Sequence, residues 1–190
     1  ICQAGGLVPI VEPEVLMDGD HEQTLERSFE VHELTLRVVF KQLADLGVQL
    51  EGMILKPSMV IPGEKCPQKA PISDVAGATV EVLLRTVPAA VSGIAFLSGG
   101  QADEEATLAL SEINRIAATR RAPWPLTFSY GRALQQAALH LWNGDDSKAA
   151  PAHAALLKRA KLNSLGALGL YDSRFEHEEE TRVLAGSPSA

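Results

Sequence analysis

A lysine that directly follows an apolar segment has the clearest chemical potential in this sequence. Lys56 comes after the apolar residues 53–55 and before Pro57, so it stands at the end of a short, buried strand. An ammonium group in such a place either extends to solvent or lies in a pocket where burial favours the neutral amine. A neutral lysine amine can attack a ketone or an aldehyde and form a Schiff base. We therefore take Lys56 as the candidate nucleophile.

Two carboxylates follow the first apolar run of the chain. Glu12 and Glu14 flank Pro13, which favours an extended conformation at Glu12. Residues two apart in an extended segment share a face, so the two carboxylates are expected to lie close together and to repel. Such a pair can donate and accept protons near neutral pH, and a carboxylate can also orient the lysine. The alternative is a solvated acidic loop.

The segments LSGGQ (97–101) and SYGRAL (129–134) combine small residues with a guanidinium group. Glycines allow backbone N–H groups to approach an anion closely, and a helix start is a ready anion site. An arginine adds a fork of donors suited to phosphate. A single SGG is most often a turn, but the two segments together predict a phosphate site. The candidate ligands are Ser98, Gly99, Ser129, Gly131 and Arg132.

These candidates end four apolar runs, each followed by a pattern of helical periodicity. The expected strands cover residues 6–11, 50–56, 92–98 and 125–130, and the expected helices cover 21–46, 73–86, 102–119, 132–142 and 148–168. Apolar strands without alternation, each followed by a helix, predict a parallel sheet covered by helices. The number of residues from one strand end to the next is somewhat larger than the ~31 residues of each unit in a (β/α)₈ TIM barrel. In such barrels the active site lies at the C-terminal ends of the strands.

Four strands are fewer than the eight that close a barrel. Either the chain is part of a longer protein or the sheet is open, and the abrupt start at Ile1 favours the first reading. We expect one domain over residues 1–170 and a flexible tail over 171–190, which is rich in Ser, Glu and Gly.

Composition excludes several classes of function. The 190 residues are 46% hydrophobic and carry a net charge of −7, which argues against nucleic-acid binding. No apolar run approaches the roughly 18 residues of a membrane span. Cys2 and Cys66 do not form a disulfide framework, and the five histidines show no zinc-binding pattern, so we expect no metal.

Together, the motifs resemble those of class I fructose-bisphosphate aldolase. The matching segments are GLVPIVEPEVLMDGDH, LEGMILKPSMVIPG, LLRTVPAAVSGIAFLSGGQ, PWPLTFSYGRALQQAAL and KRAKLNSLGALGLY. The resemblance implies an α/β fold of the (β/α)₈ TIM-barrel type, with strands five to eight in this chain. It also implies a cytoplasmic, homotetrameric enzyme of glycolysis that acts on a sugar phosphate without a metal or another cofactor.

The resemblance further implies roles for the candidate residues. Lys56 would form the Schiff base, Glu12 would transfer protons during imine formation, and Glu14 would position the lysine. Ser98, Gly99, Gly131 and Arg132 would bind the C1 phosphate of the substrate, with Ser129 as a support. The family's other essential residues lie on the first four strands, so we expect these 190 residues alone to be inactive.

Two other functions remain open from the sequence. One is a different Schiff-base lyase on the same barrel, such as a transaldolase-like enzyme. The other is a non-catalytic phosphate-binding scaffold that keeps the motifs. Two carboxylates and a paired phosphate site favour the aldolase, and the presence of Glu12, Lys56 and Arg132 argues against the scaffold.

Overall fold

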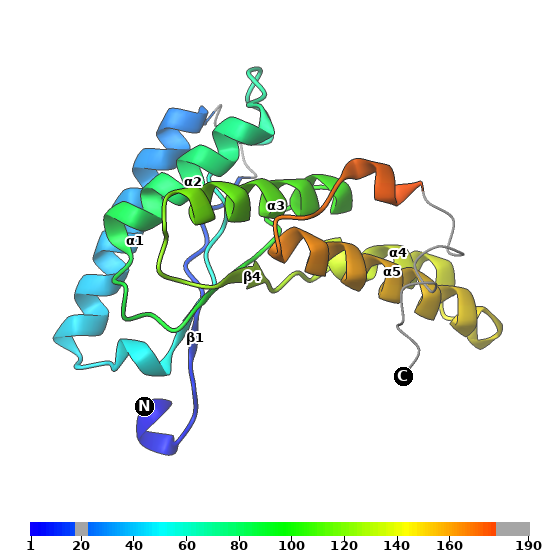
Figure 1. Ribbon diagram of the computed structural model, residues 1–190. Helices are drawn as coiled ribbons and strands as arrows, with labels where there is room; N and C mark the ends of the chain where they lie inside the picture. The colour runs from blue at the N-terminus through cyan, green and yellow to red at the C-terminus, as the bar shows by residue number, and fades with distance from the viewer. Residues whose placement is uncertain (18–22, 178–190) are drawn as a thin grey trace, which may run out of the picture.

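The computed structural model describes residues 1–17 and 23–177 of the chain. Its sheet has four parallel strands that neighbour one another in sequence order (Figure 1). They are β1 (Ile10–Val11), β2 (Ile54–Leu55), β3 (Ile94–Phe96) and β4 (Leu126–Phe128). Each lies inside a predicted strand but is shorter than predicted, because regular pairing is confined to two or three residues.

In the part of the chain that the structure describes, α1, α2 and α3 each follow one strand, and α4 and α5 both follow β4. These helices are α1 (Leu25–Asp45), α2 (Ile72–Thr86), α3 (Asp103–Thr119), α4 (Arg132–Trp142) and α5 (Ala149–Ala167). Figure 1 shows α1, α2 and α3 in succession along one side of the sheet. Helix α4 points away from the sheet beyond β4, and α5 lies beside α4 in the opposite direction. Shorter 3₁₀ turns are Gln3–Gly5, Leu50–Gly52, Asp146–Lys148 and Ser173–Glu176. The predicted helices are therefore confirmed, with small shifts at their ends.

The start of α1 differs from the prediction. The helix begins at Leu25, and the Thr24 side chain caps it by accepting a hydrogen bond from the Arg27 N–H at 3.2 Å. Asp20, whose side chain would suit the N-cap of the helix predicted from residue 21, lies outside the described residues. Gly47 follows the helix with a φ of +65°, the left-handed conformation that commonly ends a helix.

The helix-facing side of the sheet forms the core. Leu55, Ile94 and Phe96 are almost fully buried, and each such side chain contributes about 1.5–3 kcal/mol to folding. The intervening residues Ile54 and Ala95 are only half-buried. The strands therefore alternate in burial, contrary to the expectation of strands buried on both faces, because within the described residues helices cover one face. Lys56 lies two residues after Ile54 and therefore points to the same, less buried face of the sheet.

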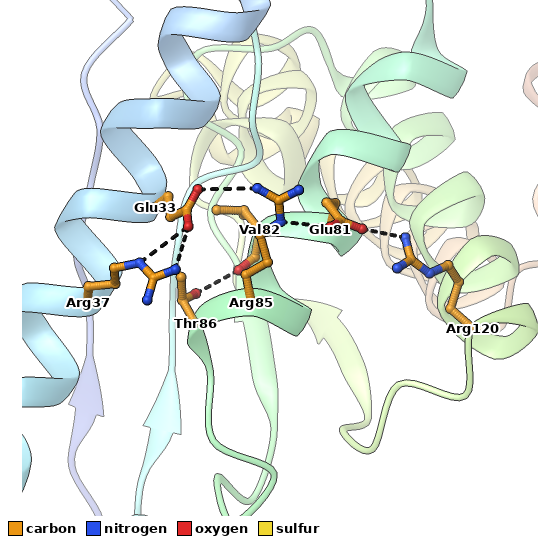
Figure 2. Close-up of polar contacts among 7 residues, drawn as sticks. All are labelled: Glu33, Arg37, Glu81, Val82, Arg85, Thr86 and Arg120. Atoms are coloured by element: carbon orange, nitrogen blue, oxygen red, sulfur yellow. Dashed lines mark hydrogen bonds and ion pairs between the residues drawn. The ribbon is translucent and has the colours of Figure 1, made fainter.

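A ladder of ion pairs joins the outer surfaces of α1, α2 and α3 (Figure 2). Glu33 on α1 pairs with Arg37 at 2.6 Å and with Arg85 of α2 at 3.6 Å. Glu81 on α2 pairs with Arg85 and with Arg120, which follows α3, both at 2.7 Å. The guanidinium groups of Arg120 and Arg85 hold the pKa of Glu81 below its ordinary value. The arginines are about half exposed and the two glutamates are 22% and 30% exposed, so we expect each pair to contribute little to stability.

The beginning of the expected C-terminal tail is packed against the domain. Tyr171 is buried, and the Glu176 carboxylate pairs with the Arg159 guanidinium of α5 at 2.8 Å, with side-chain exposures of 6% and 7%. The Tyr171 hydroxyl also donates to Glu176 at 2.6 Å. Residues 171–177 thus depart from the predicted tail, because a buried ion pair holds them, while residues 178–190 lie outside the described part.

The two thiols occupy different environments. Cys2 is exposed before β1, whereas Cys66 is buried and its Sγ donates to the Gln68 carbonyl at 3.4 Å. Both are free thiols. No helix within residues 1–17 and 23–177 has the length and apolar character that crossing a bilayer requires.

Candidate functional site

The strand register brings Lys56 beside Glu12. Val11 of β1 lies opposite Leu55 of β2, so the residues that follow these strands are neighbours. The Lys56 N–H donates to the Val11 carbonyl at 2.7 Å, and Lys56 Nζ lies 3.0 Å from Glu12 Oε1. The Lys56 side chain is 20% exposed and that of Glu12 is 47% exposed. The amine therefore has a proton-accepting carboxylate in direct contact.

Glu14 lies in a different part of the site. It lines a cavity of about 550 Å³ to which the loops after β1, β2 and β3 and the first residue of α4 contribute. Gly99, Gly100 and Arg132 line the same cavity, whereas Lys56, Glu12 and Ser98 are not among its lining residues. The two carboxylates expected to act together are thus divided, with Glu12 at the lysine and Glu14 at the cavity.

The loop after β3 has the conformation that its glycines permit. Gly99 has a φ of +55° and Gly100 a φ of +82°, a region that strains residues with a side chain. A Cβ atom on Gly100 would lie 3.9 Å from the Arg132 guanidinium, so this loop adjoins the first residue of α4. The buried Ser98 accepts a hydrogen bond from the Gln101 N–H through its carbonyl at 3.0 Å, which closes the turn.

The start of α4 supplies a second group of donors. Gly131 is the N-cap residue, and no side chain caps this helix end. The first N–H groups of a helix have no partner within the helix, so they can bind an anion. Ser129 lies just before this turn, and its N–H donates to the Phe96 carbonyl of β3 at 2.8 Å. Gly99, Gly100 and Arg132 therefore converge on one cavity, with Gly131 beside them.

One buried group near the site was not identified from the sequence. His32 of α1 contacts Ser58, which follows Lys56 and Pro57, with 2.9 Å between His32 Nε2 and Ser58 Oγ. The available signal was that His32 lies on the apolar face of α1, four residues before Leu36. A histidine there needs a buried partner, but the sequence does not say which.

This arrangement is suited to amine chemistry on a phosphorylated carbonyl compound. Lys56 can attack a carbonyl carbon while Glu12 transfers protons, and the glycine loops with Arg132 can hold a phosphate. Within the described residues, no group of three or more His, Cys, Asp or Glu side chains is arranged to hold a metal ion.

Comparisons with known proteins agree on one family. The model of the glycolytic family described as fructose-bisphosphate aldolase class-I matches residues 1–187. Fructose-bisphosphate aldolase C of Mus musculus is 54% identical over 172 residues, which cover 90% of this chain and 46% of that protein. Fructose-bisphosphate aldolase B of Gallus gallus is 56% identical over 171 residues, with the same coverage of 90% and 46%.

A solved structure gives the corresponding fold. The crystal structure of fructose-bisphosphate aldolase from Plasmodium falciparum, in complex with TRAP and a small-molecule inhibitor, superposes with a TM-score of 0.85 at 48% identity. The match covers 90% of this chain and 48% of that one. The chain thus spans about half the length of the relatives it matches. The likeness confirms the predicted fold class, an α/β chain with the parallel β/α units of the barrel.

Proposed function

The chain belongs to the class I fructose-bisphosphate aldolase family, and we propose that it carries the Schiff-base-forming part of an enzyme that cleaves fructose 1,6-bisphosphate. The products would be dihydroxyacetone phosphate and glyceraldehyde 3-phosphate. The observation that carries the proposal is the 3.0 Å contact between Lys56 Nζ and Glu12 Oε1 at the ends of adjacent parallel strands. By resemblance, the whole enzyme would be a cytoplasmic homotetramer of glycolysis.

Imine formation is the first step of the proposed mechanism. The neutral Lys56 amine attacks C2 of the ketose, and the resulting carbinolamine loses water to give an iminium ion. Glu12 accepts the proton that the lysine releases and returns a proton to the departing hydroxyl group, since its oxygen lies within hydrogen-bond distance of Nζ.

Carbon–carbon cleavage follows from the iminium ion. As a base removes the proton of the C4 hydroxyl, the electrons of the C3–C4 bond move to the iminium nitrogen. This leaves an enamine on Lys56 and releases glyceraldehyde 3-phosphate. Protonation of the enamine at C3 and hydrolysis of the imine then release dihydroxyacetone phosphate and restore the lysine. The iminium ion is the electron acceptor throughout, so no metal or other cofactor takes part in these steps.

The proposed phosphate site positions the substrate relative to the Lys56 amine. Ser98, Gly99, Gly131 and Arg132, with Ser129 in support, are our proposed ligands of the C1 phosphate. Three features favour this assignment: the left-handed glycines after β3, the uncapped start of α4, and the Arg132 side chain in the cavity. Binding at these loops would restrict the approach of C2 to the Lys56 amine.

Borohydride trapping tests the proposal directly. The chain is incubated with dihydroxyacetone phosphate, reduced, digested and analysed by mass spectrometry, both alone and after mixing with the first half of a relative such as mouse aldolase C. We expect an adduct on Lys56 and none in the Lys56→Met variant. An adduct that forms only in the mixture would mean that the other strands complete the pocket. No adduct in either preparation would overturn the Schiff-base function and favour the phosphate-binding scaffold.

A further inference from the structure

One buried hydroxyl group joins three segments around the proposed active site. Ser58 Oγ lies 2.9 Å from Nε2 of His32 in α1 and accepts a hydrogen bond from the Val15 N–H at 3.2 Å. Val15 directly follows Glu14, and Ser58 lies two residues after Lys56. His32, Ser58 and Val15 are all buried, and the proposed mechanism gives none of them a role.

The partners fix the direction of these hydrogen bonds. His32 Nδ1 lies 2.7 Å from the Ser28 carbonyl oxygen, which can only accept, so Nδ1 carries the hydrogen. Nε2 is then an acceptor for the Ser58 hydroxyl, and a lone pair of Ser58 Oγ remains for the Val15 N–H. Burial lowers the pKa of His32, which agrees with a neutral ring. Each polar group in the chain of bonds is therefore satisfied.

The contact has a specific consequence for the acidic loop. At one end the Val11 carbonyl accepts from the Lys56 N–H at 2.7 Å, and at the other end the Val15 N–H donates to Ser58. Glu12 and Glu14 lie between these two attachments to the lysine segment, in a stretch without a helix or a strand. Without the second attachment, the next backbone hydrogen bond to the segment after β2 would be that from the Glu64 N–H to the Met17 carbonyl at 2.9 Å, two residues beyond Val15.

From this geometry we propose that His32 and Ser58 are positioning residues that hold the Glu12–Glu14 loop against the Lys56 segment, with His32 fixing the orientation of the Ser58 hydroxyl. Neither residue touches the substrate. The inference rests on the proposed function, because it assigns the two residues to the step in which Glu12 serves the lysine. It predicts that loosening the loop slows imine formation more than it weakens phosphate binding, since the phosphate loops follow β3 and β4.

The test compares variants of His32 and Ser58 in the trapping reaction. We expect Ser58→Ala and His32→Leu to slow adduct formation at Lys56 by about 10- to 100-fold, as small displacements of catalytic groups do. The concentration of dihydroxyacetone phosphate that gives half the maximal rate should change by less than about threefold. His32→Gln, whose side-chain oxygen can still accept from Ser58, should restore most of the rate.

Thr79→Val is the matched control. The buried Thr79 hydroxyl accepts from the Val60 N–H at 2.9 Å, so this variant also removes a backbone partner from the segment after Lys56. It leaves the acidic loop untouched, and we expect nearly the wild-type rate. An equal loss of rate in Thr79→Val and Ser58→Ala would overturn the proposal, because the effect would then be general destabilisation.

A second readout separates this proposal from the proposed function. Hydrogen exchange of the Val15 amide, measured on the unreacted chain, reports the attachment without any chemistry. We expect faster exchange in His32→Leu than in Thr79→Val. Unchanged protection of Val15 in His32→Leu would overturn the positioning role even if Lys56 is trapped. A wild-type chain that gives no adduct either alone or in the mixture, but has a protected Val15 amide, would instead reject the Schiff-base function and leave the attachment supported.

Discussion

Glu12 and Glu14 illustrate how two similar side chains acquire different surroundings. Both follow β1 and stand two residues apart, yet Glu12 contacts Lys56 while Glu14 lines the cavity with Arg132. The sequence indicated that both belong to the site, because a Glu-Pro-Glu segment after an apolar run is extended. It could not predict that the two carboxylates lie in different places, because their positions depend on how the loop after β1 lies against the segment after β2. Their catalytic roles stay predictions.

The division of the two carboxylates leads to a first prediction. Glu12→Gln should slow borohydride trapping at Lys56 by about 100-fold or more, because the amide cannot accept the proton of the lysine. Glu14→Gln should slow trapping less, since Glu14 lies at the cavity. Trapping rates of the two variants at saturating dihydroxyacetone phosphate provide the measurement. A larger loss in Glu14→Gln would assign imine formation to Glu14 instead.

His32 leads to a second prediction, about pH. Burial lowers its pKa from the ordinary value of 6.5, against the opposing effect of backbone hydrogen bonds with Ser28 and Met59. Below pH 6.5 the unfolded chain therefore binds a proton that the folded chain does not, so stability falls as the pH falls. The loss from this one group can reach about 1.4 kcal/mol per pH unit. Urea unfolding at pH 7.5 and pH 5.5 measures it, and His32→Gln should show a smaller difference. An identical difference in both proteins would contradict the prediction.

At the level of helices and strands, local sequence patterns located most elements but not their long-range contacts. The predicted helix over 102–119 is α3 and that over 148–168 is α5, because apolar periodicity is a local signal. The Arg159–Glu176 pair was missed since a charged side chain gives no local indication that it will be buried. The His32–Ser58 contact was missed for a similar reason, because it depends on packing between segments 26 residues apart.

The buried Arg159–Glu176 pair leads to a third prediction. Glu176→Ala should lower the free energy of unfolding by about 3–5 kcal/mol, because it leaves the Arg159 guanidinium buried without its carboxylate. The double variant Arg159→Leu/Glu176→Leu should recover much of that loss, since it removes both charges. Urea denaturation of the two variants is the measurement. Similar stability of Glu176→Ala and the wild type would show that residues 171–177 do not stay docked in solution.

The ion-pair ladder on the outer helices should behave differently. Glu81→Gln removes the carboxylate that pairs with both Arg85 and Arg120. We expect a loss of stability well below that of Glu176→Ala, present at low salt and absent in about 1 M NaCl, where the Debye length is only about 3 Å. Unfolding curves at the two salt concentrations provide the measurement. A loss that persists at high salt would mean that Glu81 contributes through short hydrogen bonds that salt does not screen, because Gln keeps the packing of Glu.

For the molecule as a whole, the sheet has two unpaired edges. Within the described residues β1 and β4 each pair with one neighbour only, and Ile10 of β1 is 57% exposed. Unpaired strands and exposed apolar side chains favour association between chains. The chain spans about half the length of its relatives, which accounts for a sheet with two unpaired edges.

These edges lead to a final prediction. The chain alone should associate in sedimentation velocity experiments and should not cleave fructose 1,6-bisphosphate. Addition of the first half of mouse aldolase C should reduce this association and restore cleavage, because it would cover β1 and β4 and supply the remaining strands. A monomeric and active 190-residue chain would contradict this prediction.

Because the two thiols differ in accessibility, a dye can be attached near the β1 edge and followed by fluorescence. Cys66 is buried, so a maleimide dye at neutral pH would label the exposed Cys2 without any engineered substitution. Cys2 precedes β1 by a few residues, so the fluorescence anisotropy of the dye would rise when another polypeptide covers that edge. The native chain thus carries its own attachment point for following barrel assembly in real time.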